Sequence, residues 1–422
     1  MRKIKLPLIH KYILVCFFSI ISFFFIVKHI NKKKEEEKKA IILVPGIGAS
    51  ELFYNSTNNK NYFKGEAIFF PNKISFFNIN QFAEDLEKII NNSEILECDE
   101  KGVPINKDVG LLKDIDEVKT REKNLHDYGN LLLFKEIKTL LNSIFVTKNK
   151  HKKEIIFFNY DWRLSCDTNG DLLTKLINEY DKVTLIGYSM GGLISCKAMC
   201  NLFKKSKLDK IENYISISVP YNGSVLALYA LLTGFIENNK ILNFFYQSLE
   251  CDKKVKNLLK NYPSIYELLP TEEYFARSKG FLKNNTGVLL NYPETIDFIE
   301  KNQQLNSSLL KKAVSFHKDL FIKQKHILEY VKNKYFFIGT GYDTTSELKL
   351  GKDIKISKCE LGDNTVEMQN SAIPPIKDIQ NLNIYKIKTS HREILNNKQF
   401  LTQLKVLLKK ILEKNKYINI PK

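Results

Sequence analysis

The sequence lacks the cysteine patterns of metal-binding and disulfide-stabilised proteins. Its seven cysteines are scattered over 422 residues, and none forms a C-x-x-C pair or a cysteine–histidine spacing typical of zinc sites. We therefore expect no metal and no cofactor. The sequence also contains no internal repeat, and no basic helix or aromatic–basic motif stands out. A nucleic-acid partner is therefore not expected.

The chain is strongly basic. It has 65 basic and 47 acidic residues, which gives a formal net charge of +18 and a pI of about 9.3. Excess positive charge attracts anionic lipid head groups. However, lysine, asparagine and isoleucine are abundant along the whole chain, so the charge also fits a biased composition with solvated side chains. Both interpretations stay open at this point.

An apolar run near the N-terminus predicts membrane attachment. Residues 12–27 are almost wholly apolar, basic residues precede them, and a charged tract follows over residues 31–39. As a helix the run would span ~24 Å, slightly less than the hydrocarbon core of a bilayer. No A-x-A-like cleavage site follows, so we expect residues 1–39 to form an uncleaved single-pass anchor with a charged linker. A cleaved signal segment, and hence a secreted form, is the alternative.

Short apolar runs bounded by turns predict a parallel sheet. They cover residues 40–44, 155–158, 183–186, 214–218, 335–338 and 384–387. Continuous β-branched and aromatic runs are typical of strands that are buried on both faces. Helical spacing over 128–144 and 172–180 predicts crossover helices. The expected fold class is therefore α/β, with a mostly parallel central sheet and helices on both faces.

Two long stretches exceed what this sheet needs. Residues 51–130 are polar and aromatic, whereas residues 221–325 contain apolar helical segments at 225–236 and 241–249. We expect both to be insertions in one catalytic domain, residues 40–422. The apolar helix faces in the second insertion predict a cap, residues 221–325, that packs on the body of the domain. Such a cap can also cover an apolar acyl pocket and open at a lipid surface.

The segment VTLIGYSMGGLIS, residues 183–195, predicts a nucleophilic serine. It places G-x-S-x-G between a strand and a helix, which is the nucleophile elbow of α/β-hydrolases. The glycines let the chain turn tightly around Ser189. The turn would hold the Ser189 hydroxyl at a helix N-terminus, whose dipole favours a developing anion. A serine in an ordinary strand-to-helix turn is the alternative.

A serine hydroxyl needs a base, and His391 is the strongest candidate. In α/β-hydrolases the acid and then the histidine follow the serine along the chain, and His391 lies just after the last predicted strand. His317 and His326 lie in lysine-rich segments that we expect to be helical and solvated. We expect the acid to be Asp363, in a glycine-containing turn, with Asp343 as the alternative. The acid would hold the imidazole in one tautomer and stabilise the imidazolium.

Two backbone N–H groups should form an oxyanion hole. One belongs to the residue after the nucleophile, Met190. The other should come from the turn after the first predicted strand, Pro45-Gly46-Ile47-Gly48, and we assign it to Ile47. These assignments depend on position alone, because a backbone donor does not require a particular side chain.

Six motifs occur in order along residues 40–395. They are Val44-Pro45-Gly46-Ile47, Tyr160-Asp161-Trp162-Arg163, Gly187 to Gly192, Pro263-Ser264 with Glu267-Leu268-Leu269-Pro270, Gly362-Asp363 with Thr365-Val366, and His391. Together they resemble the lecithin:cholesterol acyltransferase family of α/β-hydrolases, and the YDWR block is the most specific of them. The resemblance implies a catalytic triad of Ser189, Asp363 and His391, with Ile47 and Met190 as oxyanion donors.

The resemblance also places the loop of Trp162 near the mouth of the site. Trp162 and Arg163 are therefore candidate substrate-binding residues, and Asp161 or Arg163 could contact a lipid head group. A structural ion pair between Asp161 and Arg163 is the alternative.

The chain departs from the family pattern at three places. Tyr188 stands where members commonly have histidine, and we expect this change to be neutral. Asn364 replaces a glycine after the acid, which is tolerable if its φ is positive. No cysteine lies between Glu51 and Glu97, so the lid disulfide of the animal enzymes is missing. Sterol specificity is therefore not implied, whereas the acyl chemistry is unaffected.

The sequence thus predicts a membrane-associated serine acyl hydrolase or O-acyltransferase. Its expected partner is a lipid ester at a membrane surface, and its acyl-enzyme on Ser189 would pass the acyl chain to water or to an alcohol. Two other functions stay open. The chain could be an esterase for non-lipid, protein-linked or wall-linked acyl esters, or a catalytically silent hydrolase-fold binding protein.

Overall fold

The computed structural model describes residues 37–57, 64, 67–69, 93–111, 131–145, 154–234 and 251–417. The chain divides into two units, Met1–Lys38 and Lys39–Lys422. The predicted anchor over residues 12–27 and the predicted segment 241–249 lie outside the described residues. Of the helices that are described, none has both the length and the apolar character needed to cross a bilayer.

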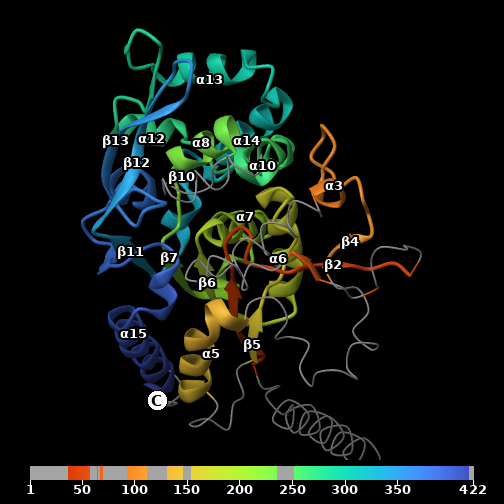
Figure 1. The fold of residues 1–422 in the computed structure, drawn as a ribbon. Helices are drawn as coiled ribbons and strands as arrows, with labels where there is room; N and C mark the ends of the chain where they lie inside the picture. The colour runs from red at the N-terminus through yellow and green to blue at the C-terminus, as the bar shows by residue number, and fades with distance from the viewer. Residues whose placement is uncertain are drawn as a thin grey trace, which may run out of the picture. The chain divides into compact units, whose positions relative to one another are not determined.

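A six-stranded sheet forms the centre of the second unit (Figure 1). The strands lie in the order β14-β11-β7-β6-β1-β5, and each neighbouring pair is parallel. Their bounds are β1 Lys39–Val44, β5 Glu154–Phe157, β6 Lys182–Tyr188, β7 Ile211–Ile217, β11 Lys334–Thr340 and β14 Asn383–Lys388. All six strands overlap runs predicted from the sequence, and the parallel α/β fold class is confirmed.

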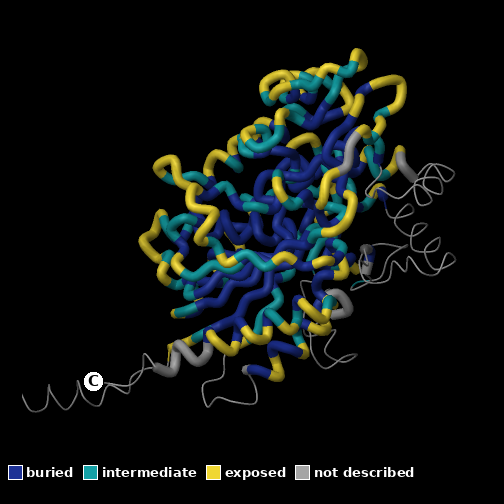
Figure 2. Tube along the Cα trace, turned by 90° about the vertical axis from the view of Figure 1, so that its left-hand side faces the viewer, coloured by how far each residue is buried: buried dark blue, intermediate teal, exposed yellow. Residues whose placement is uncertain are grey.

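The two faces of the sheet are covered by different helices. In β1, Ile41 and Leu43 belong to one apolar cluster and Ile42 and Val44 to another, because successive strand side chains point to opposite faces. The first cluster includes α5 (Leu131–Phe145) and α15 (Lys398–Tyr417), and the second includes α6 (Cys166–Asn178) and α7 (Met190–Lys204). Figure 2 shows the buried strands at the centre and the exposed residues in peripheral loops.

The described part of the chain between β7 and β11, which contains the predicted cap residues 221–325, is mostly helical. Its helices are α8 Val225–Thr233, α10 Cys251–Leu259, α11 Pro263–Tyr266, α12 Glu272–Arg277, α13 Tyr292–Lys301, α14 Ser307–Asp319 and η3 Ile327–Tyr330. Its short strands are β8 Leu282–Lys283, β9 Phe321–Ile322 and β10 Lys325–His326. In Figure 1 helices α8, α10, α12, α13 and α14 lie above the central sheet.

The sequence analysis missed an antiparallel hairpin after β11. Strand β12 (Tyr342–Lys349) pairs with β13 (Lys355–Gly362), and β8 of the cap adds a third strand. Residues 344–348 of β12 are buried although most of them are polar, so this strand carries no apolar run. A pattern search based on apolar runs therefore cannot find it.

Further short elements complete the described residues. Strands β2 Leu52–Tyr54, β3 Ala67–Phe69 and β4 Val109–Gly110 form a small antiparallel sheet, and the remaining helices are α3 Ser93–Leu96, η2 Leu208–Lys210, the π-helical turn η4 Met368–Ala372 and η5 Glu393–Asn396.

Candidate active site

Ser189 lies on a sharp turn between β6 and α7. Its φ of 52° and ψ of −131° are strained for a residue with a side chain. The flanking glycines have no room for one. A methyl group on Gly191 would overlap the carbonyl oxygen of Val44, and one on Gly187 would come within 2.8 Å of the Cα of Gly192. Close packing therefore keeps the serine hydroxyl at the N-terminal end of α7.

His391 joins Ser189 to Asp363. Its Nε2 lies 2.9 Å from the Ser189 Oγ, and its Nδ1 lies 2.8 Å from the Asp363 Oδ2. A carboxylate oxygen accepts, so Nδ1 carries the proton and Nε2 is left to accept from the serine hydroxyl. The His391 N–H also donates to the Asp363 backbone oxygen at 2.7 Å. The structure therefore brings the three predicted residues into one hydrogen-bonded chain.

The Asp363 carboxylate is fixed by its own turn. It is 1% exposed and directly follows β13. Its Oδ1 accepts from the N–H groups of Val366 at 2.7 Å and Thr365 at 3.1 Å, which leaves Oδ2 for the histidine. Asn364 has a φ of 75°, the positive value that its replacement of glycine requires. The alternative acid, Asp343, lies exposed on β12.

The turn after β1 lies directly beside Ser189. A methyl group on Gly46 would come within 2.9 Å of the Ser189 Cβ and 3.3 Å of its Oγ. Ile47 follows in this turn, and Met190 is the first residue of α7, where an N–H has no acceptor within its own helix. Both predicted oxyanion donors thus belong to backbone segments that flank Ser189.

The side chain of Tyr188 contacts His391. The sequence analysis expects the presence of tyrosine instead of histidine at this position to have no effect on function. Its hydroxyl donates to the His391 backbone oxygen at 2.9 Å, and its ring centroid lies 5.3 Å from that of the imidazole. Phe134 of α5 packs edge-on against the Tyr188 ring, with the two ring centroids 5.8 Å apart. Burial raises the pKa of the Tyr188 phenol, so its proton stays available for this bond. The residue that replaces the family histidine therefore holds the backbone of His391.

Arg163 is a structural residue, which corrects its prediction as a substrate contact. The side chain is fully buried and forms an ion pair with Asp161, 2.7 Å between Nη2 and Oδ2. It also donates to the carbonyl oxygens of Val109 at 2.8 Å and Leu96 at 3.3 Å. The guanidinium therefore ties the YDWR block to β4 and α3, and it has no surface left for a head group.

Trp162 is also largely buried. It is 6% exposed, and its Nε1 donates to the Ser50 backbone oxygen at 3.1 Å. Its ring packs edge-on against Tyr262 with centroids 5.8 Å apart. Its contact with a substrate stays a prediction.

Glu267 of the ELLP motif joins the cap to the N-terminus of α6. Its carboxylate is 3% exposed and accepts from the Cys166 N–H at 2.6 Å. Burial raises the pKa of Glu267 to about 8, although the N–H groups at the helix N-terminus lower it. This titratable group lies outside the triad, and sequence reasoning had no signal for its burial.

Of the two histidines that we expected to be solvated, His326 is buried and His317 is half-buried, contrary to our expectation. His326 is 1% exposed at the start of η3, and its Nδ1 accepts from the Leu328 N–H. His317 of α14 bonds through Nε2 to the Glu267 backbone oxygen at 2.7 Å. Burial lowers the pKa of His317 to about 4 and that of His326 to about 3, so both are neutral at pH 7.

The cap also holds the segment after Asp363. Ser224 at the start of α8 donates through Oγ to the Thr365 backbone oxygen at 2.6 Å. Tyr274 of α12 donates its hydroxyl to the buried Glu367 carboxylate, also at 2.6 Å. The segment that follows Asp363 is therefore bonded to the predicted cap at two places.

Within the described ranges, no group of three or more histidine, cysteine, aspartate or glutamate side chains is arranged to bind a metal ion.

Comparisons with known proteins address the fold and the family. The crystal structure of the Tle4–Tli4 complex contains a chain that matches with a TM-score of 0.61 and 13% identity, over 89% of this chain and 99% of that chain. The mature form of the lipase BlEst2 from Bacillus licheniformis matches with a TM-score of 0.35 and 12% identity, over 90% of this chain and 94% of that chain. The first likeness concerns the fold alone. No curated protein sequence matches the chain.

A sequence profile gives the family. The profile described as lecithin:cholesterol acyltransferase matches residues 72–360, which is more than half of the chain. The α/β fold and the hydrogen bonds that link Ser189, His391 and Asp363 agree with this match. The protein belongs to the lecithin:cholesterol acyltransferase family.

Proposed function

We propose that this protein is a membrane-associated serine acyl hydrolase or O-acyltransferase that acts on lipid esters through an acyl-enzyme on Ser189. Membership of an acyltransferase family supports acyl chemistry in general. The observation that carries the serine mechanism is the chain from Asp363 Oδ2 through His391 to Ser189 Oγ, with atom pairs 2.8 and 2.9 Å apart. This is the spacing that a nucleophile and its base need.

The chemistry would proceed in two steps. His391 Nε2 takes the hydroxyl proton while Ser189 Oγ attacks the ester carbonyl, and the resulting oxyanion is stabilised by the N–H groups of Met190 and Ile47. The imidazolium then gives its proton to the departing alcohol, which leaves the acyl-enzyme. In the second step His391 takes a proton from water or from an acceptor alcohol, and the oxygen of that molecule attacks the acyl carbonyl. Ser189 Oγ then leaves and takes the proton back from His391, which releases a free fatty acid or a new ester.

The rest of the chain would bring the active site to a lipid surface and enclose the acyl chain. In this proposal residues 1–39 anchor the catalytic domain, residues 40–422, to a membrane through the apolar run 12–27. The two insertions, residues 51–130 and 221–325, would form a lid and a cap around the acyl chain. Exclusion of water under the cap would decide whether water or an alcohol accepts the acyl group.

The test compares full-length wild type with Ser189→Ala on phospholipid vesicles that contain a long-chain alcohol, with mass spectrometry of the products. Removal of the nucleophile should lower turnover by roughly 10⁶-fold. Serine-dependent free fatty acid alone would identify a hydrolase, and serine-dependent acylated alcohol would identify a transferase. If both folded proteins gave no lipid product, the lipid proposal would be wrong. Turnover of water-soluble esters would then separate a non-lipid esterase from a silent binding protein.

A further inference from the structure

The turn that carries Ile47, residues 45–50, has little stiffness of its own. It begins at Pro45, directly after β1, and two of its residues are glycines, Gly46 and Gly48. Glycine restricts the backbone less than any other residue. Within the turn the Ala49 N–H donates to the Gly46 carbonyl oxygen at 3.3 Å, which is longer than the usual ~2.9 Å. The orientation of its peptide planes therefore depends on bonds from outside the turn.

The YDWR block supplies bonds to both ends of this turn. Strands β1 and β5 are parallel neighbours, so the chain leaves both of them at the same edge of the sheet. The Tyr160 hydroxyl donates to the Pro45 carbonyl oxygen at 2.7 Å. At the other end the Tyr160 N–H donates to Ser50 Oγ at 3.2 Å, and Trp162 Nε1 donates to the Ser50 carbonyl oxygen at 3.1 Å. One short segment after β5 therefore holds the first and the last residue of the turn.

The surroundings of Tyr160 preserve its bond to Pro45. The side chain is 0% exposed, and its ring stacks on that of Phe158 with centroids 5.9 Å apart. Burial raises the pKa of the Tyr160 phenol, so the hydroxyl keeps its proton and stays a donor. Because the peptide unit is planar, a fixed Pro45 carbonyl also fixes the direction of the Gly46 N–H.

The fixed carbonyl group also contacts the segment of the other proposed oxyanion donor. A methyl group on Gly191 would approach the Pro45 oxygen to 2.4 Å, so this oxygen packs against the first turn of α7, which begins at Met190. The same carbonyl lies one peptide before the Gly46–Ile47 peptide, whose N–H is the second proposed donor. A shift of the Pro45 carbonyl would therefore move the two donors relative to each other.

We propose that Tyr160 is a positioning residue for the oxyanion hole. Its phenol fixes the Pro45–Gly46 peptide and thereby keeps the Ile47 N–H in place while negative charge develops on the ester oxygen. This role rests on the proposed function, because it matters for catalysis only if Ser189 attacks an ester. Tyr160 does not contact the substrate, and it acts through the turn rather than through His391.

The test compares full-length wild type with Tyr160→Phe, which keeps the ring and removes the bond to Pro45. The substrates are a short-chain aryl ester and the matching thionoester, in which sulfur replaces the carbonyl oxygen. Sulfur accepts hydrogen bonds weakly, so the thionoester gains little from the oxyanion donors. We expect kcat and kcat/KM for the ester to fall together, roughly 10- to 100-fold, and kcat/KM for the thionoester to fall several times less.

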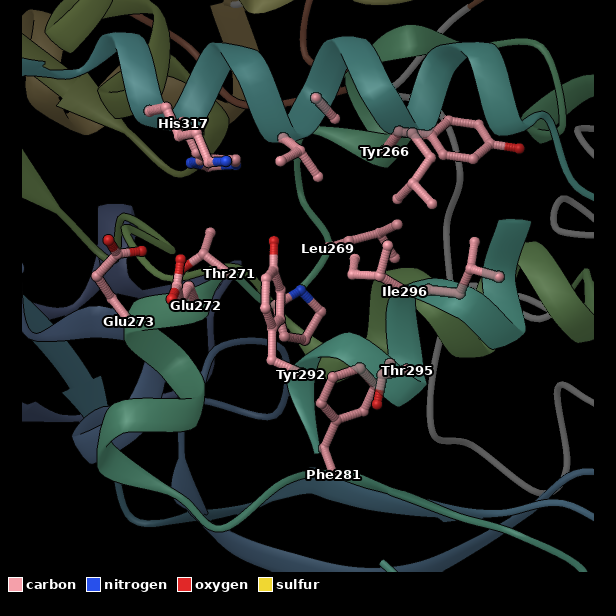
Figure 3. A pocket seen from close by; sticks show the side chains of 16 residues that line it. Tyr266, Leu269, Thr271, Glu272, Glu273, Phe281, Tyr292, Thr295, Ile296 and His317 are labelled. Carbon is pink, nitrogen blue, oxygen red and sulfur yellow. The ribbon is translucent and has the colours of Figure 1, made fainter. Parts of the chain in front are cut away.

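The matched control is Tyr266→Phe. Tyr266 is 1% exposed, and its hydroxyl donates to the Lys260 backbone oxygen at 2.9 Å and accepts from the Asn306 N–H at 2.7 Å. It lines a small cavity of about 40 Å³ in the predicted cap, between α14 and the pair α12 and α13 (Figure 3), and neither the turn 45–50 nor the triad lines that cavity. The control loses two bonds of its hydroxyl, so Tm should fall at least as much as in Tyr160→Phe while the ratio of ester to thionoester rates stays unchanged.

Ser50→Ala tests the other end of the turn. It removes the acceptor of the Tyr160 N–H and leaves the phenol bond to Pro45 in place. The ratio of ester to thionoester rates should therefore fall in the same direction, but by a smaller factor than in Tyr160→Phe. If Tyr160→Phe does not fold, this variant decides the question, and an unchanged ratio would overturn the positioning role.

Amide hydrogen exchange over residues 45–50, measured by mass spectrometry, follows the turn without any substrate. Exchange should be faster in Tyr160→Phe than in wild type and unchanged in Tyr266→Phe. If wild type showed no Ser189-dependent turnover, the proposed function would fail, whereas the exchange data would still decide whether Tyr160 holds the turn. Wild-type exchange in folded Tyr160→Phe would overturn the positioning role. So would an equal loss of rate for the ester and the thionoester, or an unchanged kcat for the ester.

Discussion

Removal of the Tyr188 hydroxyl should impair catalysis more than it impairs folding. In Tyr188→Phe the ring keeps its packing against Phe134 and the imidazole, but the 2.9 Å bond to the His391 backbone oxygen is lost. Both residues are more than nine-tenths buried, at 4% and 8% exposed, so water replaces the lost donor poorly. A buried acceptor left without its partner costs about 1–3 kcal/mol.

The loss should be visible in the rate because the bond is to His391, the proposed general base. If the His391 loop relaxes to recover a donor, its Nε2 moves away from the Ser189 Oγ, now 2.9 Å distant. A misplacement of about 1 Å can lower the rate roughly 10²-fold, and about 1.4 kcal/mol corresponds to a tenfold change. We therefore expect kcat/KM on a short-chain aryl ester to fall roughly 10- to 100-fold.

The matched control is Tyr330→Phe. This hydroxyl also donates to a backbone oxygen, that of Ile322 at 3.0 Å, but it lies on η3 outside the triad. Each variant should lower Tm by a few degrees, whereas only Tyr188→Phe should slow ester hydrolysis and phosphonate labelling of Ser189. If folded Tyr188→Phe kept the wild-type kcat/KM, the positioning role of Tyr188 would be refuted.

Three further predictions test the acid, the buried cap carboxylate and the elbow. Asp363→Asn should keep the fold but lower kcat by roughly 10⁴-fold, because the histidine loses its tautomer control; steady-state kinetics with a melting curve would check this, and an unchanged kcat would contradict the role of the acid. The raised pKa of Glu267, about 8, means that the folded chain keeps a proton that the unfolded chain loses near pH 4.5, so this residue should make stability fall as pH rises from about 5 to 8. Glu267→Gln should reduce that fall in urea unfolding at the two pH values, and equal pH dependence would disprove the assignment. Gly191→Ala should destabilise the chain strongly, by about 3 kcal/mol or more, because its methyl group overlaps backbone atoms, whereas Gly110→Ala has nothing within 4 Å and should melt close to wild type.

The sheet and the order of the site residues could be predicted because their signals are local. The six strands of the central sheet appear as apolar runs, and the glycines around Ser189 mark the elbow. Asp363 and His391 follow from chain order and from their positions beside predicted strands. Periodicity and turn chemistry are enough for such features, since they depend only on neighbouring residues.

The missed features depend on residues that are distant in sequence. The ion pair between Arg163 and Asp161 was an open alternative, but the bonds of Arg163 to the carbonyl groups of Leu96 and Val109 could not be read from a motif. His317 and His326 were expected in solvent because lysines surround them, yet tertiary packing buries His326 and bonds His317 to the cap. Composition reports the average environment of a segment, whereas burial is decided for each side chain by what packs against it.

The bonds between the predicted cap and the segment after Asp363 limit how the cap can be exchanged in a chimera. Ser224 and Tyr274 hold Thr365 and Glu367 across a long stretch of sequence. A chimera whose cap lacked these two donors would lose both bonds and leave the Glu367 carboxylate buried without its phenol. A cap exchange should therefore either keep hydrogen-bond donors at positions 224 and 274 or move residues 363–367 together with residues 221–325.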